Sequence, residues 1–328
     1  MQRREFIALL GGMALAAPGM ARAEMPEKVF RLALVSPMGL MPAGSPNGKV
    51  LLGALNALGY KAGENLIFEA PTAPPGKPVP PEKIIEQLKA RKVDLIVAWG
   101  FPVVQAAKAA GIPTVVAFGV GDPVATGLVQ NLAQPGGVVT GISDVATTLS
   151  TKRLGLLKEL QPKLNRVAML WNKDDLGMSL RYEASARAAQ AIGADVEAVG
   201  VREPDDFNEA FAVMDKDTPD AILMVSDSLT MLNRERVFDY AAAHRLPAIY
   251  EFDSLVREGG LMSYGADLKE SFERVAAMVD RIFKGAKPGD LPFEQPTRYL
   301  LVINLKTAKS IGLEIPPTLL ALADEVIE

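Results

Sequence analysis

The sequence predicts an α/β protein built from two doubly wound parallel-sheet lobes. Short runs of Val, Ile, Leu and Ala alternate with helical stretches along nearly the whole chain. These runs are continuously apolar, as is typical of parallel strands that are covered by helices on both faces. With 328 residues the chain is also about twice as long as one ordinary domain, which favours two lobes.

The expected strands and helices alternate along the chain, and this alternation is interrupted once, near the middle. In the first half we expect strands at Val29–Val35, Leu66–Glu69, Asp94–Ala98 and Thr114–Phe118, and helices at Gly48–Leu58, Pro81–Lys92 and Pro102–Ala110. In the second half we expect strands at Arg166–Trp171, Asp195–Val199, Ala221–Val225 and Pro247–Tyr250, and helices at Met178–Ile192, Asp205–Asp215 and Leu229–His244.

An internal repeat supports the division into two lobes. The strand Arg31–Ser36 has a counterpart at Arg166–Trp171, and the strand led by Asp94 has one led by Asp220. In each half a helix follows the Asp-led strand, and an Ile-Pro or Leu-Pro pair then starts the next strand. Chance similarity between apolar strands is the alternative. We expect the two lobes to be joined near Val139–Ser150.

Composition excludes several classes of protein. The chain has 35 Lys and Arg against 39 Asp and Glu, so it lacks the basic surface of a nucleic-acid-binding protein. It has no cysteine, which excludes disulfides, thiol nucleophiles and cysteine-bound metals. His244 is the single histidine, and no Ser-His-Asp set, phosphate loop, Rossmann fingerprint or metal-ligand cluster is visible. We therefore predict no enzymatic activity, no cofactor and no metal site.

The N-terminus has the pattern of an export signal. Arg3 and Arg4 form a positive region before the apolar run Phe6–Ala17, which Pro18 and Gly19 end. Ala21-Arg22-Ala23 then supplies a small-residue cleavage site. We expect a signal peptide over residues 1–23, cleaved after Ala23, and a mature chain in the periplasm. The two arginines leave both the Sec and the twin-arginine route open.

Candidate ligand contacts follow from the architecture. In open parallel sheets, ligands bind beyond the carboxyl ends of the strands, where loops and helix N-termini converge. Two such lobes would place these ends opposite each other across a cleft. The candidate ligand-binding residues at these ends are Ser36, Trp99, Gly100, Phe101, Asp122, Trp171, Asn172, Asp227 and Tyr250.

Several of these residues have an equally plain structural interpretation. Asp122 and Asp227 each precede a helix start, where a carboxylate caps free N–H groups, and Asn172 has the same capacity in its loop. The aromatic side chains are candidates for a ligand wall or for the lobe core. The acid pairs Asp174-Asp175 and Asp205-Asp206 are interpreted as helix starts.

The chain also resembles a known family. The motifs that carry the resemblance run in order along nearly the whole mature chain: Gly59-Tyr60, Gly63–Leu66, Gly121–Val124, Gly127–Val129, Ala133–Gly141, Leu170–Asn172, Leu246–Tyr250, Gly259–Gly265, Lys284–Pro288 and Leu301–Ala308. With these motifs the chain is similar to ABC-transporter substrate-binding proteins of the type I periplasmic-binding-protein fold, in the subfamily that includes tryptophan- and tyrosine-binding proteins.

The resemblance implies how the two lobes are assembled. It implies a first lobe from residues 24–141 and 265–290 and a second from residues 142–264 and 291–328, with a cleft between them. The chain would cross between the lobes near 139–144, 261–265 and 291–298. A helix at Leu268–Lys284 would return to the first lobe.

The resemblance also implies a function. The protein would be an extracytoplasmic receptor that closes around a small organic ligand and delivers it to the permease subunits of an ABC importer in the inner membrane. The ligand would be an aromatic or apolar amino acid or a related carboxylate, and the receptor a monomer. The alternatives are a ligand-loaded periplasmic sensor and, less favoured, an exported enzyme.

Overall fold

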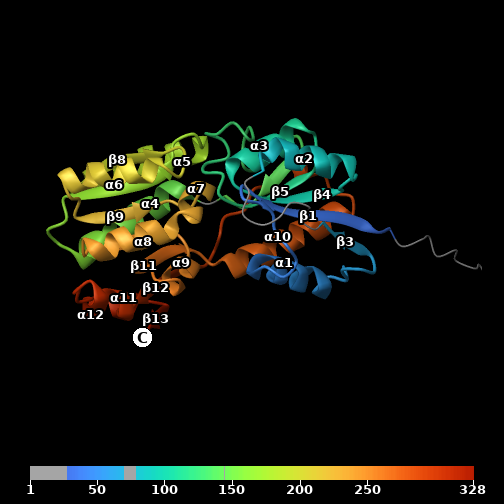
Figure 1. Ribbon diagram of the computed structural model, residues 1–328. Coiled ribbons are helices and arrows are strands. Elements are labelled where there is room, and N and C mark those ends of the chain that lie inside the picture. Colours follow the sequence, from blue (N-terminus) through green and yellow to red (C-terminus); the bar gives the residue numbers. More distant parts are fainter. Residues whose placement is uncertain (1–27, 70–78, 144) are drawn as a thin grey trace, which may run out of the picture.

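A computed structural model describes residues 28–69, 79–143 and 145–328, which form two α/β lobes side by side (Figure 1). The expected signal peptide, residues 1–23, lies outside the described residues. Each lobe has one mainly parallel sheet with helices on both faces, as the continuously apolar strands predict. Within the described part of the chain, no helix is long and apolar enough to cross a membrane.

The first lobe is built on a sheet with the strand order β2-β1-β4-β5-β6, and β3 also pairs with β1. Apart from the antiparallel β2, these strands are parallel. Their bounds are β1 Phe30–Ser36, β2 Gly39–Leu40, β3 Leu66–Phe68, β4 Leu95–Trp99, β5 Thr114–Phe118 and β6 Val139–Gly141. The short hairpin of β1 and β2 was not expected, and it turns the chain back directly over the end of β1.

Helices cover both faces of the first sheet. Helices α2 (Pro81–Ala90) and α3 (Phe101–Ala109) cover one face, and α1 (Pro46–Ala57) and α10 (Leu268–Phe283) cover the other (Figure 1). Helix α10 returns from the second lobe to this position. Its start is fixed by Asp267, whose carboxylate accepts hydrogen bonds from the N–H groups of the first turn.

The second lobe is built on a sheet with the strand order β13-β12-β11-β10-β9-β7-β8. Only the pair β11 and β12 is antiparallel. The bounds are β7 Arg166–Asn172, β8 Asp195–Val201, β9 Ala221–Met224, β10 Ala248–Tyr250, β11 Met262–Ala266, β12 Tyr299–Asn304 and β13 Glu325–Ile327. The expected lobe boundary between residues 264 and 265 therefore falls inside β11, because β12 pairs with this strand as far as Ala266.

Two groups of helices cover the second sheet. One face carries α4 (Ala146–Leu160), α5 (Leu176–Ala191), α11 (Leu305–Ser310) and α12 (Pro317–Leu322), and the other carries α6 (Asp206–Lys216), α7 (Ser228–Leu232), α8 (Arg234–Ala243) and α9 (Asp253–Arg257). The single helix expected at Leu229–His244 is two helices. They meet at Asn233, whose side-chain amide donates to the carbonyl of Leu229 and ends α7.

The segments that connect the lobes are bonded to one another. The N–H of Ser143 donates to the carbonyl of Glu294, and the N–H of Glu294 donates to the carbonyl of Gly141. The chain therefore passes between the lobes at residues 142–143 and near residue 294 as two adjacent segments. The remaining passage follows Ala266 and leads into α10.

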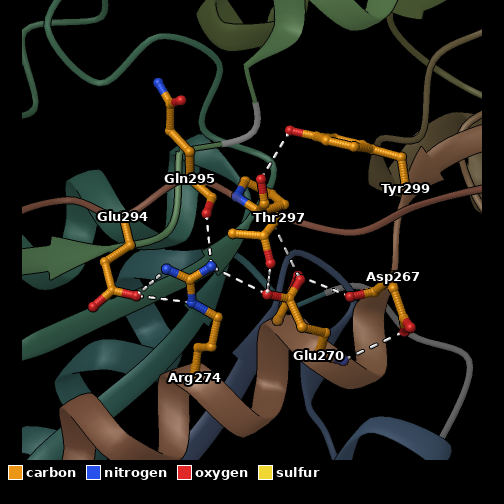
Figure 2. A network of polar contacts seen from close by, with 9 residues as sticks. Asp267, Glu270, Arg274, Glu294, Gln295, Thr297 and Tyr299 are labelled. Carbon is orange, nitrogen blue, oxygen red and sulfur yellow. Dashed lines mark hydrogen bonds and ion pairs between the residues drawn. The ribbon is translucent and has the colours of Figure 1, made fainter.

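A polar network connects α10 to the interlobe segment near residue 294 (Figure 2). The Nε of Arg274 donates to the carboxylate of Glu294 at 2.8 Å, and its Nη1 donates to the carbonyl of Gln295 at 2.8 Å. Glu270 accepts a hydrogen bond from the hydroxyl of Thr297 at 2.8 Å. These contacts fix α10 against the connecting segment at residues 294–297.

Candidate functional site

A small cavity lies between the two lobes, at the carboxyl ends of their central strands. Its volume is about 50 Å³. The first lobe contributes Ser36, Pro37, Met38, Met41, Trp99, Gly100 and Gly119, and the second contributes Asp175, Met178, Ser226, Asp227, Ser228 and Met231. We call this space the cleft cavity. Its position is the one that parallel sheets favour for a ligand.

Aromatic side chains of both lobes meet beside the cleft cavity. The ring of Trp99 packs edge-on against those of Phe118 and Phe252, with centroid distances of 5.7 and 5.3 Å. Phe252 belongs to the second lobe, as does Arg181, whose guanidinium lies over the Phe118 ring at 5.2 Å. The two lobes are therefore in direct contact on this side of the cavity.

Two glycines allow the backbones of the lobes to approach each other. A Cβ atom on Gly177, in the first turn of α5, would lie 3.1 Å from the carbonyl oxygen of Val120 in the first lobe. A Cβ atom on Gly121 would lie 3.1 Å from the carbonyl oxygen of Gly177. Side chains at these positions would hold the lobes further apart.

Asp227 is both a helix cap and a wall of the cleft cavity. Its Oδ1 accepts hydrogen bonds from the N–H groups of Leu229 and Thr230, and its Oδ2 accepts one from the N–H of Asn172. The residue is 7% exposed. Burial raises the pKa of Asp227 to about 6, although the N–H donors act in the opposite direction.

Asp175 faces the same cavity from the start of α5. It caps this helix by accepting a hydrogen bond from the N–H of Met178, and it is 5% exposed. Burial raises the pKa of Asp175 to about 7, and the charge of Asp227 adds to the rise. Two carboxylates with raised pKa values thus face the same small cavity.

Ser226 supplies a further polar group. Its hydroxyl is buried and has no hydrogen-bond partner among the described residues. Because buried polar groups are nearly always paired, such a hydroxyl on a cavity wall is a candidate ligand contact. It stands next to Asp227, so the polar groups of the second lobe gather at one end of the cavity.

Methionines form much of the apolar wall. Met38 and Met41 come from the first lobe, and Met178 and Met231 come from the second. Methionine side chains are flexible and polarizable, and they adapt to ligands of different shape, especially to aromatic rings. Together with Trp99 they make the rest of the cavity suited to an apolar body.

A buried ionic cluster supports the floor of the site. The carboxylate of Glu251 accepts hydrogen bonds from Arg153 at 2.9 Å and from Arg181 at 2.6 Å, and all three residues are buried. Its second oxygen accepts a hydrogen bond from the N–H of Ser226. Burial alone would raise the pKa of Glu251, but the guanidiniums of Arg181 and Arg153 hold it below its usual range.

The structure brings four of the candidate ligand-binding residues together and places the others elsewhere. Ser36, Trp99, Gly100 and Asp227 all line the cleft cavity. At Gly100 a side chain would collide with Pro37, because a Cβ atom would lie 2.6 Å from the proline ring. Glycine at this position therefore allows the Pro37 ring to pack directly against the backbone.

The other aromatic candidates pack inside the lobes. Phe101 lies in the core of the first lobe, and its N–H donates to the carbonyl of Gly119, so it does not offer this group to a ligand carboxylate. Trp171 stacks on Tyr182 in the core of the second lobe, with a centroid distance of 4.3 Å. Tyr250 is also buried in that lobe, away from the cleft cavity.

The remaining polar candidates serve their own loops. Asp122 is exposed and accepts hydrogen bonds from the N–H groups of Val124 and Ala125, so it caps a turn where we expected a helix start. The side chain of Asn172 accepts a hydrogen bond from the N–H of Asp174. Neither residue lines the cleft cavity.

Sequence reasoning missed Asp175 and the methionines as site residues. Asp175 was interpreted as a helix start, and it is one, but the same position also faces the cavity. Ser226 lies between the end of β9 and Asp227, at one of the strand ends where ligand contacts are expected. Among the described residues, no group of His, Cys, Asp and Glu has an arrangement that could hold a metal ion.

Comparison with known proteins gives consistent results. The family model described as "ABC transporter substrate binding protein" matches residues 46–327. A curated protein called "Tyrosine-binding protein", from Clostridioides difficile strain R20291, is 26% identical over 268 residues, which is 81% of this chain and 76% of that protein.

Solved structures share the fold. A conserved domain protein from Vibrio cholerae aligns with a TM-score of 0.83 at 28% identity, covering 91% of this chain and all of that one. An ABC domain from Streptococcus pneumonia in complex with L-Trp gives a TM-score of 0.79 at 24% identity, over 91% of this chain and 99% of that one. A ligand-free, open substrate-binding protein from Clostridium difficile gives 0.64 at 25% identity, over 92% and 99%.

Proposed function

The chain belongs to the ABC transporter substrate-binding protein family, and from this premise we propose that it is a periplasmic receptor for an aromatic amino acid. The receptor delivers this ligand to the permease of an ABC importer and catalyses no reaction of its own. The observation that carries the proposal is the cleft cavity, in which two buried carboxylates and a free hydroxyl face a wall of methionines and Trp99. The tyrosine-binding relative supports the same ligand class.

The polar end of the cavity favours an amine. Asp175 and Asp227 contribute carboxylates, and no Lys or Arg among the described residues lines the cavity. A ligand ammonium would pair with both charges, whereas an amine-free carboxylate would meet repulsion. The apolar wall from both lobes would then enclose an aromatic side chain.

Binding requires the lobes to open. A cavity of about 50 Å³ is far below the roughly 300–1,000 Å³ of pockets that hold organic ligands. The contact between Gly121 and Gly177 and the packing of Trp99 on Phe252 hold the lobes together in this arrangement. We infer that the ligand enters an open form and that the lobes close around it by rotation about the connecting segments.

We expect the mature protein to bind L-tryptophan, L-phenylalanine or L-tyrosine in calorimetric titrations. The Trp99→Ala variant should weaken this binding by about tenfold or more, which is about 1.4 kcal/mol, because the ligand ring loses a wall. Trp171→Phe is the matched control, since Trp171 packs inside the second lobe, and its affinity should stay within about twofold of the native value. Tight binding of a sugar or a metal ion that Trp99→Ala leaves unchanged would refute the proposal.

The Gly177→Val variant should bind the same ligand at least about tenfold more weakly, because its side chain meets the carbonyl of Val120 and blocks full closure. Small-angle scattering should show that ligand reduces the radius of gyration of the native protein and not that of the variant. Gly155→Ala is the control, because a Cβ atom at this helical glycine meets nothing within 4 Å. Equal compaction of Gly177→Val and native protein would contradict the inferred closure.

A further inference from the structure

A second and larger cavity lies on the second lobe alone. Its volume is about 420 Å³. It opens between α8, the starts of β10 and β11, and α11, and the lining residues are Glu235, Phe238, Asp239, Ala241, Ala242, Leu246, Ala248, Tyr250, Glu258, Gly259, Leu261, Thr307, Ser310 and Ile311. We call it the α8 cavity. It shares no residue with the cleft cavity, and its volume lies within the range of small-molecule sites.

Tyr250 gives this cavity a polar group that nothing else in the fold uses. The residue is 1% exposed and lines the α8 cavity, and among the described residues no hydrogen-bond partner of its hydroxyl is found. Burial raises the pKa of Tyr250, so the hydroxyl stays protonated and neutral. Because polar groups are nearly always paired, a hydroxyl on a cavity wall without a protein partner takes a ligand atom or a water as its partner.

The walls around Tyr250 combine aromatic rings with acids. The rings of Tyr250 and Phe238 stand at 89° to each other with a centroid distance of 5.3 Å, and so they form a corner. Glu235, Asp239 and Glu258 are exposed carboxylates around the same cavity, and within the described part of the chain only Glu258 has a cation beside it, Arg234. No Lys, Arg or His is among the lining residues.

We propose that the α8 cavity is a second ligand site, which binds a small organic amine with an apolar body. The ammonium donates a hydrogen bond to the Tyr250 hydroxyl, lies near the aromatic corner and is attracted by the carboxylates at the rim. The aliphatic lining, which includes Leu246, Leu261 and Ile311, covers the apolar body. The site is separate from the cleft and does not depend on the ligand proposed there.

Titration with n-hexylamine, followed by NMR of labelled methyl groups, tests the proposal. The Leu and Ile methyl groups of the α8 cavity report on this site, and those of Met38 and Met231 report on the cleft. We expect saturable shifts of the Leu246, Leu261 and Ile311 signals, and binding of uncharged n-hexanol about fivefold weaker or more. Binding at the cleft changes only the methionine signals, so failure of one proposal is distinguishable from failure of the other.

Two sets of variants complete the test. Tyr250→Phe keeps the ring and removes the hydroxyl, and it should weaken n-hexylamine binding by about threefold or more. The double variant Glu235→Gln, Asp239→Asn changes only exposed groups, so it should fold normally. It should weaken binding of n-hexylamine by a similar factor and leave binding of n-hexanol unchanged. Shifts confined to the methionines, equal binding of n-hexanol, or unchanged binding by both sets of variants would overturn the proposal.

Discussion

The Glu251→Gln variant is expected to lose about 3–5 kcal/mol of its free energy of unfolding, measured by urea titration. In the native protein the carboxylate of Glu251 pairs with the guanidiniums of Arg153 and Arg181, all at 3% exposure or less. Glutamine keeps the shape and removes the charge, so two cations remain buried without this counter-charge. The hydrogen bond to the N–H of Ser226 is weakened as well, which loosens the cleft loop before Asp227.

A surface glutamate provides the control for this variant. Glu64 pairs with Lys61 at 3.3 Å, and both side chains are more than half exposed. Glu64→Gln should therefore change the free energy of unfolding by less than about 1 kcal/mol. If Glu251→Gln were no more destabilising than Glu64→Gln, the buried cluster would not be what holds the floor of the site.

The Asp175→Asn variant should stabilise the ligand-free protein at pH 8 by about 2–4 kcal/mol and should weaken binding of an amino acid by about tenfold or more. The pKa of Asp175 is raised from 3.8 to about 7, so the folded state binds the proton of this carboxyl group more tightly than the unfolded state does. Above about pH 4, ionisation of this carboxyl group stabilises the unfolded state. The folded state gains the same stabilisation only above about pH 7. Asp175 therefore lowers the stability progressively between pH 4 and 7 and by a constant amount above pH 7.

Unfolding in urea at several pH values measures this effect. The difference in stability between Asp175→Asn and the native protein should grow from pH 4 to pH 7 and then level off. Asp174→Asn is the matched control, because Asp174 is exposed and pairs with Arg202 on the surface. A pH-independent difference, or unchanged affinity for the amino acid, would show that Asp175 is merely a helix cap.

The eight expected strands could be predicted closely because each is specified by its own residues, whereas β2, β6, β11, β12 and β13 are not among the expected elements. The strand expected at Thr114–Phe118 has these bounds in the structure, and the one expected at Arg166–Trp171 is only one residue longer. Both are continuous apolar runs that a two-sided helical cover requires. The break between α7 and α8 could not be predicted in this way, because it depends on the side-chain bond of Asn233 and not on apolar periodicity.

The site was predicted only in part, because packing between the lobes determines which side chains face the cleft cavity. Trp99 and Trp171 both stand at the carboxyl ends of parallel strands, yet Trp99 faces the cleft and Trp171 stacks on Tyr182 within its own lobe. Nothing local distinguishes them. Asp175 shows the converse limit, since a helix-capping carboxylate looks the same in sequence whether it faces water or the opposite lobe.

The return of α10 to the first lobe has a consequence for how the chain matures. The Tyr60 hydroxyl donates to Asp280, a residue 220 positions later, and the Phe30 ring stacks on that of Phe283. Until α10 has been synthesised, the face of the first sheet that α1 and α10 cover together lacks α10, even if the part of the second lobe that precedes α10 is complete. The strand β12, which pairs with β11, is made later still. The native contacts of the first lobe are thus complete only after α10 has been synthesised, and those of the second sheet only after β12.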